Sequence, residues 1–274
     1  MTVAIVTDGA AALPAEVQAR LGVGVVPMTV SIDGIAVVES DLTLDELLTT
    51  PGLTTSGPSP GAFATAMAAA DSPDGVLVLT VAASLSSTHQ SAVLAANSGG
   101  AGIRVLDTGT AAGGQALVVE AAAEAAAAGR TLDEVAARAD QVARRVRLVG
   151  ALDGLDQLVR SGRIPALAGK AGDRLGVRPL FEIVDGEIRS LRPAHSIAAA
   201  SARILKLWRA TRPCAGSLHL VALHAGAPHR ATALLDAVRS EAEPISSFVS
   251  GFGPAMIVNS GPGVFGLAWW WDVS

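Results

Sequence analysis

The chain has 274 residues, of which 50% are hydrophobic and 16% are charged, and its formal net charge is −5. This length accommodates one large domain or two medium ones, and the acidic balance excludes nucleic acid as the main partner, because phosphate binding needs a concentrated basic face. No run reaches the roughly 18 uninterrupted apolar residues that a membrane-spanning helix requires, so we expect no stable insertion into a membrane.

The N-terminal stretch MTVAIVTDGA contains no lysine or arginine and begins with a strand pattern. It does not resemble a signal peptide, and we therefore expect a cytoplasmic protein. The single cysteine, Cys214, can form no internal disulfide, and we expect it to be a buried apolar residue. The five histidines are scattered without carboxylates at ligand spacing, so we expect neither a metal site nor a cofactor.

In the first half of the chain, short apolar runs alternate with longer helical patterns. The predicted strands cover residues 3–6, 23–30, 75–81 and 103–107, and the predicted helices cover residues 14–21, 43–49, 60–71, 88–97 and 111–128. The sequence TLDE occurs twice, at 43–46 and 131–134, and predicts a capping box at the start of a helix each time. Gly129 is typical of a residue that ends the preceding helix. This alternation predicts a mostly parallel sheet between helices, without antiparallel pairing.

The second half contains an Asp185-Gly186 pair flanked by alternating apolar residues, which predicts a β-hairpin. Further predicted elements are helices over 196–210 and 228–241 and strands over 217–224 and 255–260. We therefore predict an α/β protein with two domains. Residues 1–150 would form the first, with the parallel sheet and the ligand-binding loops, and residues 151–274 the second, with a mixed sheet and a hairpin.

Small polar side chains gather at the ends of the predicted strands, where ligands bind in parallel sheets. They are Asp8, Thr54, Thr55, Ser56, Ser84, Ser86, Ser87, Thr88, Asn259 and Ser260. Serine and threonine are also ordinary helix N-caps, worth about 1 kcal/mol each. The hydroxyls at 84–88 exceed what one cap requires, which favours a binding role.

Three binding or catalytic roles are open for this hydroxyl cluster. A serine nucleophile would need a base such as His89, but the chain has no G-x-S-x-G motif. A phosphate site would be expected to carry the glycines and the lysine of a P-loop, which are missing. A cradle of neutral donors for a small anionic head group such as a carboxylate fits the residues best.

Seven stretches, taken in order, resemble the motifs of the DegV family, whose characterised members are FakB-type fatty-acid-binding proteins. They are VTDGAAALP (6–14), VVPMTVSIDG (25–34), TTSGPSPGAF (54–63), LSSTHQSA (85–92), LVRSGRI (158–164), LGVRPLFEIVDGEI (175–188) and NSGPGVFGLAW (259–269). The first is similar to the family pattern T-D-S-x-x-D-L-P, the fourth to L-S-G-T-Y-Q-S-A and the last to H-T-G-P-G-A-x-G. Gly9 stands at the serine of the first pattern, and Asn259 stands at the histidine of the last.

The resemblance implies that one long-chain fatty acid lies in a tunnel between two α/β domains. It implies that hydroxyls of Thr55 and Ser86 bind the carboxylate, with Asn259 beside them and Arg163 at the place of the family arginine. Further ligand-binding candidates are Ser56, Ser84, Thr88 and Ser260. We expect the apolar lining to come from Ile164–Leu175, Leu180 and Val264–Leu267.

The resemblance also implies a carrier that is not an enzyme and that delivers its fatty acid to a separate ATP-dependent fatty-acid kinase. The sequence leaves two alternative functions open. One is a hydrolase or phosphatase-like enzyme that acts on acyl or phosphate esters through Ser86 and Asp8. The other is a degenerate family member that has lost its ligand and serves as an interaction module.

Overall fold

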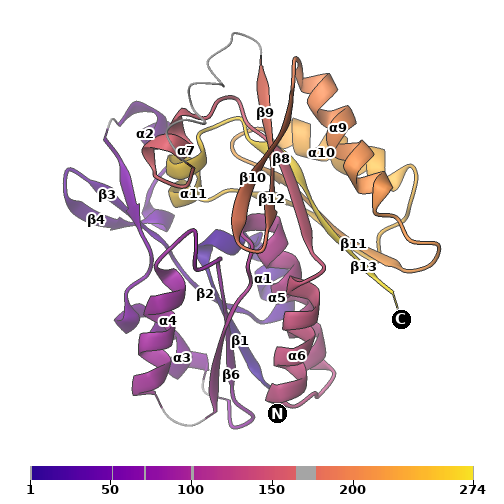
Figure 1. The fold of residues 1–274 in the computed structure, drawn as a ribbon. Coiled ribbons are helices and arrows are strands. Elements are labelled where there is room, and N and C mark those ends of the chain that lie inside the picture. The colour runs from indigo at the N-terminus through magenta and orange to yellow at the C-terminus, as the bar shows by residue number, and fades with distance from the viewer. Residues whose placement is uncertain (1, 51, 71, 100–101, 165–176, 274) are drawn as a thin grey trace.

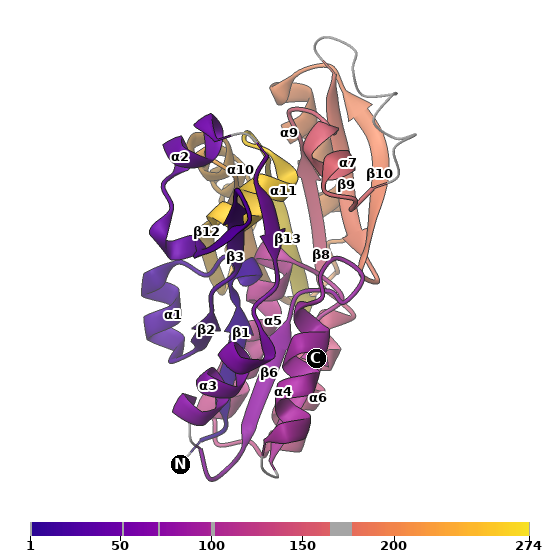
Figure 2. The ribbon, with the colours of Figure 1, turned by 90° about the vertical axis from the view of Figure 1, so that its left-hand side faces the viewer.

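The computed structural model describes residues 2–50, 52–70, 72–99, 102–164 and 177–273. A parallel sheet lies in the lower part of the molecule and a six-stranded mixed sheet in the upper part (Figures 1 and 2). Helix α5 (Ala112–Ala127) packs against strands of both sheets and therefore lies where the two parts meet.

The parallel sheet has four strands in the order β2-β1-β6-β7. They are β1 (Ala4–Asp8), β2 (Gly24–Val26), β6 (Val76–Thr80) and β7 (Ile103–Asp107). The helices around it are α1 (Ala15–Leu21), α3 (Pro60–Ala70), α4 (Thr88–Ser98), α5 and α6 (Leu132–Ala143). All of β6 is buried, because α3 and α4 cover one face of the sheet and α5 covers the other. The predicted parallel sheet between helices is confirmed.

The predicted helix ends are present as well. Thr43, before α2 (Leu44–Thr49), and Thr131, before α6, each form a reciprocal capping box with the glutamate three residues later. Helix α5 ends at Ala127, and Gly129 follows with a positive φ of 74°.

A small antiparallel sheet, in the order β4-β3-β5, contradicts two predictions for the first half. Its strands are β3 (Thr29–Ile32), β4 (Ile35–Val38) and β5 (Thr54–Ser56). The single strand predicted over 23–30 is wrong, because Pro27 has no N–H for a ladder and separates β2 from β3. The expected lack of antiparallel pairing is also wrong: Asp33 and Gly34, at φ 49° and 82°, close a hairpin between β3 and β4.

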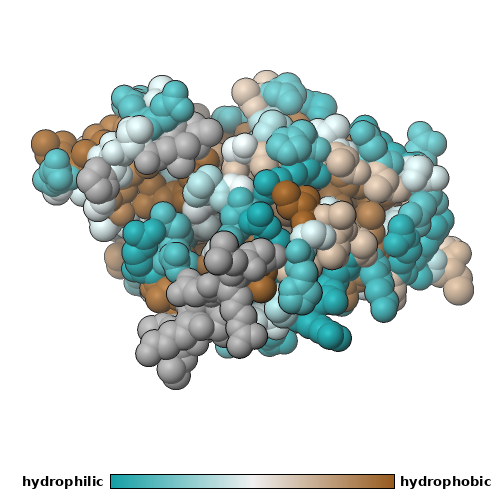
Figure 3. All heavy atoms as spheres, turned by 90° about the horizontal axis from the view of Figure 1, so that it is seen from above, coloured by the Kyte–Doolittle hydropathy of each residue, from teal (hydrophilic) through white to brown (hydrophobic). Residues whose placement is uncertain are grey.

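The outer strand β4 of the small sheet exposes apolar side chains, and the middle strand β3 attaches the sheet to helix α11. Ile35 and Val38 on β4 are 69% and 41% exposed. Hydrophobic surface accordingly gathers at the left edge of Figure 3, on the side of this hairpin. Val30 on β3 packs with Ala255 of helix α11 (Pro254–Ser260) in a buried cluster. This attachment places β5 beside α11.

The mixed sheet has the strand order β10-β9-β8-β13-β11-β12, in which only β11 and β12 pair in parallel. Its strands are β8 (Arg147–Ala151), β9 (Arg178–Val184), β10 (Glu187–Ala194), β11 (Ser217–His224), β12 (Ser246–Gly251) and β13 (Phe265–Asp272). Helices α9 (Ile197–Ala210) and α10 (Pro228–Arg239) cover one face, and α5 packs against the other. The predicted hairpin at Asp185-Gly186 joins β9 to β10.

Two other predictions for the second half fail, and three strands were missed. The strand predicted over 255–260 is helix α11, which begins with Pro254 at a position that favours helix starts. Strands β8, β12 and β13 carry no clear alternation and were not predicted. Cys214 is exposed, not buried.

The described part of the chain contains no helix long and apolar enough to cross a membrane. Among the same residues, no three histidine, cysteine or acidic side chains form a group that could hold a metal ion.

Candidate ligand-binding site

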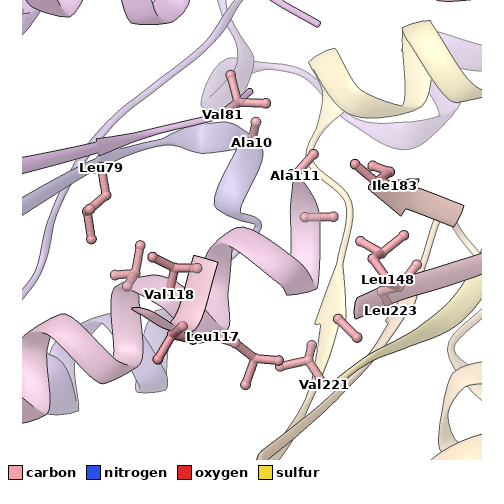
Figure 4. Packing of buried hydrophobic residues seen from close by; sticks show 14 of the residues in the cluster. Ala10, Leu79, Val81, Ala111, Leu117, Val118, Leu148, Ile183, Val221 and Leu223 are labelled. Atoms are coloured by element: carbon pink, nitrogen blue, oxygen red, sulfur yellow. The ribbon is translucent and has the colours of Figure 1, made fainter. Parts of the chain in front are cut away.

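An apolar cavity of about 90 Å³ lies between the parallel sheet and the mixed sheet. Figure 4 shows Ala10, Val81 and Ala111 on the side of the parallel sheet, and Leu148 and Ile183 on the side of the mixed sheet. The other apolar residues that line it are Met28, Leu85, Ala112, Leu152, Leu158, Phe181, Ile188, Phe252 and Met256. The cavity therefore lies beyond the carboxyl ends of β1 and β6, where parallel sheets bind ligands.

Four polar residues interrupt this apolar lining: Ser86, Arg163, Asn259 and Ser260. Ser86 precedes α4, Arg163 follows the short helix α7 (Asp156–Arg160), and the other two end α11. All four were predicted as ligand-binding residues, and the fold brings them to one cavity from three separate segments. Hydroxyls, an amide and a guanidinium can together donate several hydrogen bonds to an anion.

Thr55 is connected to these four polar residues by hydrogen bonds to Asn259. The Asn259 Nδ2 donates to Thr55 Oγ1 at 3.1 Å and to the Ala255 carbonyl at 3.0 Å, and Thr55 Oγ1 lies 3.2 Å from Asn259 Oδ1. Gly57, two residues after Thr55, packs so closely on α4 that a Cβ there would lie 2.6 Å from Thr88 Oγ1. The loop of β5 is thus held between α11 and the start of α4.

The remaining predicted hydroxyls have local partners. Thr88 is buried, and its Oγ1 lies 2.8 Å from Ser86 Oγ. Ser84 is exposed and donates to the carbonyl of Gly186, and the Gly186 N–H donates to the Gly109 carbonyl at 2.8 Å. Ser84 therefore attaches the β9–β10 turn to the parallel sheet and lies outside the cavity lining. Ser56 is exposed on β5 and also lies outside the lining.

Arg163 lines both the cavity and a larger, open groove of about 790 Å³. Its guanidinium donates to the Ser161 carbonyl at 2.8 Å, and it forms no ion pair within the part of the chain that the structure describes. Burial lowers the pKa of this guanidinium from its ordinary value, yet an arginine remains charged near neutral pH. The cavity lining consequently includes one cation among otherwise neutral donors.

The groove gives the polar residues a route to solvent. Asn259 lines it as well as the cavity, together with Thr55 from β5 and Arg160 and Ser161 at the end of α7. The cavity and the groove thus share Arg163 and Asn259, and a ligand group bound beside these two residues could be reached from the groove.

Two buried carboxylates support the loops around the cavity. Asp8 accepts hydrogen bonds from the Val81 and Ala10 amides at 2.8 and 3.0 Å, and both donors belong to residues of the cavity wall. Complete burial raises the pKa of Asp8 to about 6 despite these donors. Glu39 accepts from the Met28 amide at 2.9 Å and from the Ala255 amide at 3.3 Å, and so connects the small sheet to α11.

The side chains needed for serine hydrolysis are not arranged as a nucleophile and base. Ser86 pairs with Thr88, whereas His89 Nδ1 lies 2.9 Å from Thr80 Oγ1. Asp8 is fully buried and bonded to backbone amides. No observation in the described residues favours ester hydrolysis through Ser86 and Asp8.

The predicted apolar lining is wrong for the residues that the structure describes, because neither Ile164 nor Leu180 nor any residue of Val264–Leu267 lines the cavity. Leu180 and Leu267 pack beneath α9 and α10, on the face of the mixed sheet that points away from the cavity. The actual lining on β9 comes from Phe181 and Ile183, since neighbouring strand residues point to opposite faces. Of the predicted stretch Ile164–Leu175, only Ile164 lies within the described residues, and it belongs to the buried core.

Comparison with protein-family models supplies the identity of the fold family. The model described as uncharacterised proteins of the DegV family matches residues 2–271. The chain belongs to the DegV family. The resemblance inferred from seven sequence motifs is thereby confirmed.

Individual relatives cover from about two thirds to all of the chain. A DegV domain-containing protein of Streptomyces coelicolor is 36% identical over 273 residues, which are 97% of each chain. A protein of Thermotoga maritima named fatty acid-binding protein is 29% identical over 196 residues, 71% of this chain and 68% of its own. The solved structure described as fatty acid binding of a DegV family protein from Thermus thermophilus is 27% identical, covers all of both chains and has a TM-score of 0.89.

One departure from the DegV motifs has a structural reason. Gly9, at the place of the motif's serine, lies against Glu39 so closely that a Cβ there would overlap the Glu39 carboxylate and lie 3.2 Å from Met28 Cγ. Sequence reasoning missed Glu39 as a residue of this region. The sequence signal was the motif departure at Gly9, because the contact joins short turns that follow strands of two different sheets.

Proposed function

We propose that this protein is a carrier, not an enzyme, that holds one long-chain fatty acid in the cavity and exposes its carboxylate toward the groove. The observation that carries the proposal is an apolar cavity whose lining includes the polar residues Ser86, Asn259, Ser260 and Arg163, two of which, Asn259 and Arg163, also line the open groove. The fatty acid-binding names of the Thermotoga and Thermus relatives agree with this assignment.

The energetics favour such a ligand. Burial of about 14 methylenes contributes roughly 11 kcal/mol at about 0.8 kcal/mol each, against ordering costs of several kcal/mol. The cavity is also adaptable, because Met28 and Met256 in its lining are flexible side chains that can adjust to a ligand.

The head group needs donors that tolerate burial. Neutral hydroxyls and an amide avoid the desolvation cost of a fully buried lysine, and Arg163 contributes charge from the edge of the cavity. Thr55 is hydrogen-bonded to Asn259, so it would orient the Asn259 amide and offer its own hydroxyl to the carboxylate.

The groove suits transfer of the head group to a partner. We infer that a separate ATP-dependent fatty-acid kinase reaches the carboxylate there and phosphorylates it, and that this takes place in the cytoplasm. We also propose two domains that divide at the start of β8, slightly before the predicted boundary at residue 150, since β8 is the first strand of the mixed sheet along the chain.

Two measurements test the proposal. Protein purified from a bacterial host and analysed by denaturing mass spectrometry should release fatty acid in close to equimolar amount. After delipidation, the protein should take up a fluorescent fatty acid and, with a purified fatty-acid kinase and ATP, support formation of acyl phosphate. A protein that neither retains nor takes up fatty acid would be the degenerate interaction module, and turnover of an acyl ester by the protein alone would indicate an enzyme.

A further inference from the structure

One residue on the cavity face of β8 has no side chain. Leu148, Gly150 and Leu152 point to the same face of the mixed sheet, because alternate strand residues share a face. Leu148 and Leu152 line the cavity. Gly150, between them, pairs directly with Phe181 on the neighbouring strand β9, and Phe181 also lines the cavity.

The ring of Phe181 covers the space above Gly150. A Cβ built on Gly150 would lie 2.7 Å from both Cε1 and Cζ of that ring, whereas carbon atoms in contact prefer about 3.5–4.0 Å. The ring therefore lies across the glycine backbone instead of standing away from the sheet. An aromatic ring over a strand glycine restores packing that the glycine lacks.

A side chain at position 150 would displace the ring from its present position. The backbone of β8 lies beneath the ring, so the ring cannot move toward the sheet. Leu148 and Leu152 stand on either side along the strand. The displaced ring would consequently swing away from the sheet and into the cavity.

We infer that the Gly150–Phe181 pair is a specificity determinant that sets the length of acyl chain the cavity accepts. This inference rests on the proposed fatty-acid binding. Gly150 keeps the ring flat and leaves the space above it to the chain. A methyl group at position 150 would push the ring into the part of the cavity above residue 150. Loss of the ring at position 181 would enlarge that part of the cavity.

The test compares affinities of the delipidated full-length protein for dodecanoate and octadecanoate by calorimetry. Each methylene excluded from the cavity weakens binding by about four-fold. Gly150→Ala should therefore weaken octadecanoate binding relative to dodecanoate by about fifteen-fold if two methylenes are excluded. Phe181→Leu should shift the ratio toward octadecanoate, and the double variant should return toward the parent ratio.

Leu180→Ala is the matched control, because Leu180 neighbours Phe181 but packs beneath α9 and α10 on the other face. It should lower the melting temperature without changing the ratio of the two affinities. If Gly150→Ala does not fold, Phe181→Leu decides by itself. An unchanged ratio in a folded Phe181→Leu or Gly150→Ala protein that still binds both fatty acids overturns the inference. Failure of the parent protein to bind either one overturns the proposed function instead.

Discussion

Replacement of Ser86 by alanine tests the head-group site most directly. Ser86 lines the cavity, and its Oγ lies 2.8 Å from Thr88 Oγ1 and accepts the Thr88 amide at 3.3 Å. Alanine removes a donor that a bound carboxylate would otherwise use. The carboxylate then stays in the cavity with one unsatisfied position.

The magnitude follows from the charge of the acceptor. A hydrogen bond to a charged group contributes about 1.5–3 kcal/mol, so Ser86→Ala should weaken fatty-acid binding by about ten- to one-hundred-fold. The substitution also removes two hydrogen bonds between Ser86 and Thr88, both between neutral groups and one of them long, and their loss should lower the unfolding free energy by about 1 kcal/mol. The melting temperature should accordingly fall by no more than about 4 °C.

Ser84→Ala provides a control matched in chemistry and in sequence position. Ser84 lies outside the cavity lining and donates to the Gly186 carbonyl, so its loss removes a comparable neutral hydrogen bond. Both variants are titrated with a fluorescent fatty acid after delipidation, and their melting temperatures are measured by calorimetry. The reasoning is refuted if Ser86→Ala binds as tightly as the parent, or if both variants lose affinity equally.

Three other predictions concern the buried polar groups. Burial raises the pKa of Asp8 from 3.8 to about 6, so the stability that the protonated carboxyl contributes falls as pH rises from 4 to 6. The unfolding free energy of the parent minus that of Asp8→Asn, measured in urea, should therefore fall by about 2 kcal/mol from pH 4 to pH 7, and a constant value would contradict the raised pKa. Gly9→Ala should lower the unfolding free energy of the parent, and should lower it by at least about 1 kcal/mol less in a Glu39→Ala background, where the overlapping carboxylate is absent. If the effects of the two substitutions on the urea-unfolding free energy are additive, the two residues are not in this contact. The Asn259→His protein should bind fatty acid more tightly at pH 6 than at pH 8, because a protonated imidazole attracts the carboxylate, and its affinity should change more with pH than that of the parent. Equal pH profiles of the two proteins in fluorescence titrations would show that residue 259 lies away from the head group.

The failed strand at 255–260 illustrates why some elements could not be predicted from the sequence. AMIVNS is apolar and β-branched, and its composition alone favours a strand. The segment is helical because Pro254 begins a helix and because α11 packs against α7 and the small sheet. The error affected the site as well, since Asn259 and Ser260 lie at the end of a helix and not beyond a strand.

The local features of this protein follow from the amino-acid sequence alone. Capping boxes, the Asp-Gly hairpin at 185–186 and the buried strands of the parallel sheet depend on residues within a few positions of one another, and their periodicity is visible in the chain. Family motifs likewise singled out Ser86, Arg163 and Asn259 as candidates without any coordinates.

Which of these residues meet, and what surrounds them, depends on how the elements pack. Thr55 and Asn259 are 204 positions apart and form their hydrogen bonds because the small sheet packs on α11. Ser84 and Ser86 look alike in the sequence, yet one holds the hairpin turn and the other lines the cavity. The pairing of Gly150 with Phe181 depends on strand register, and a slip of one residue would turn Leu180 toward the cavity in place of the ring.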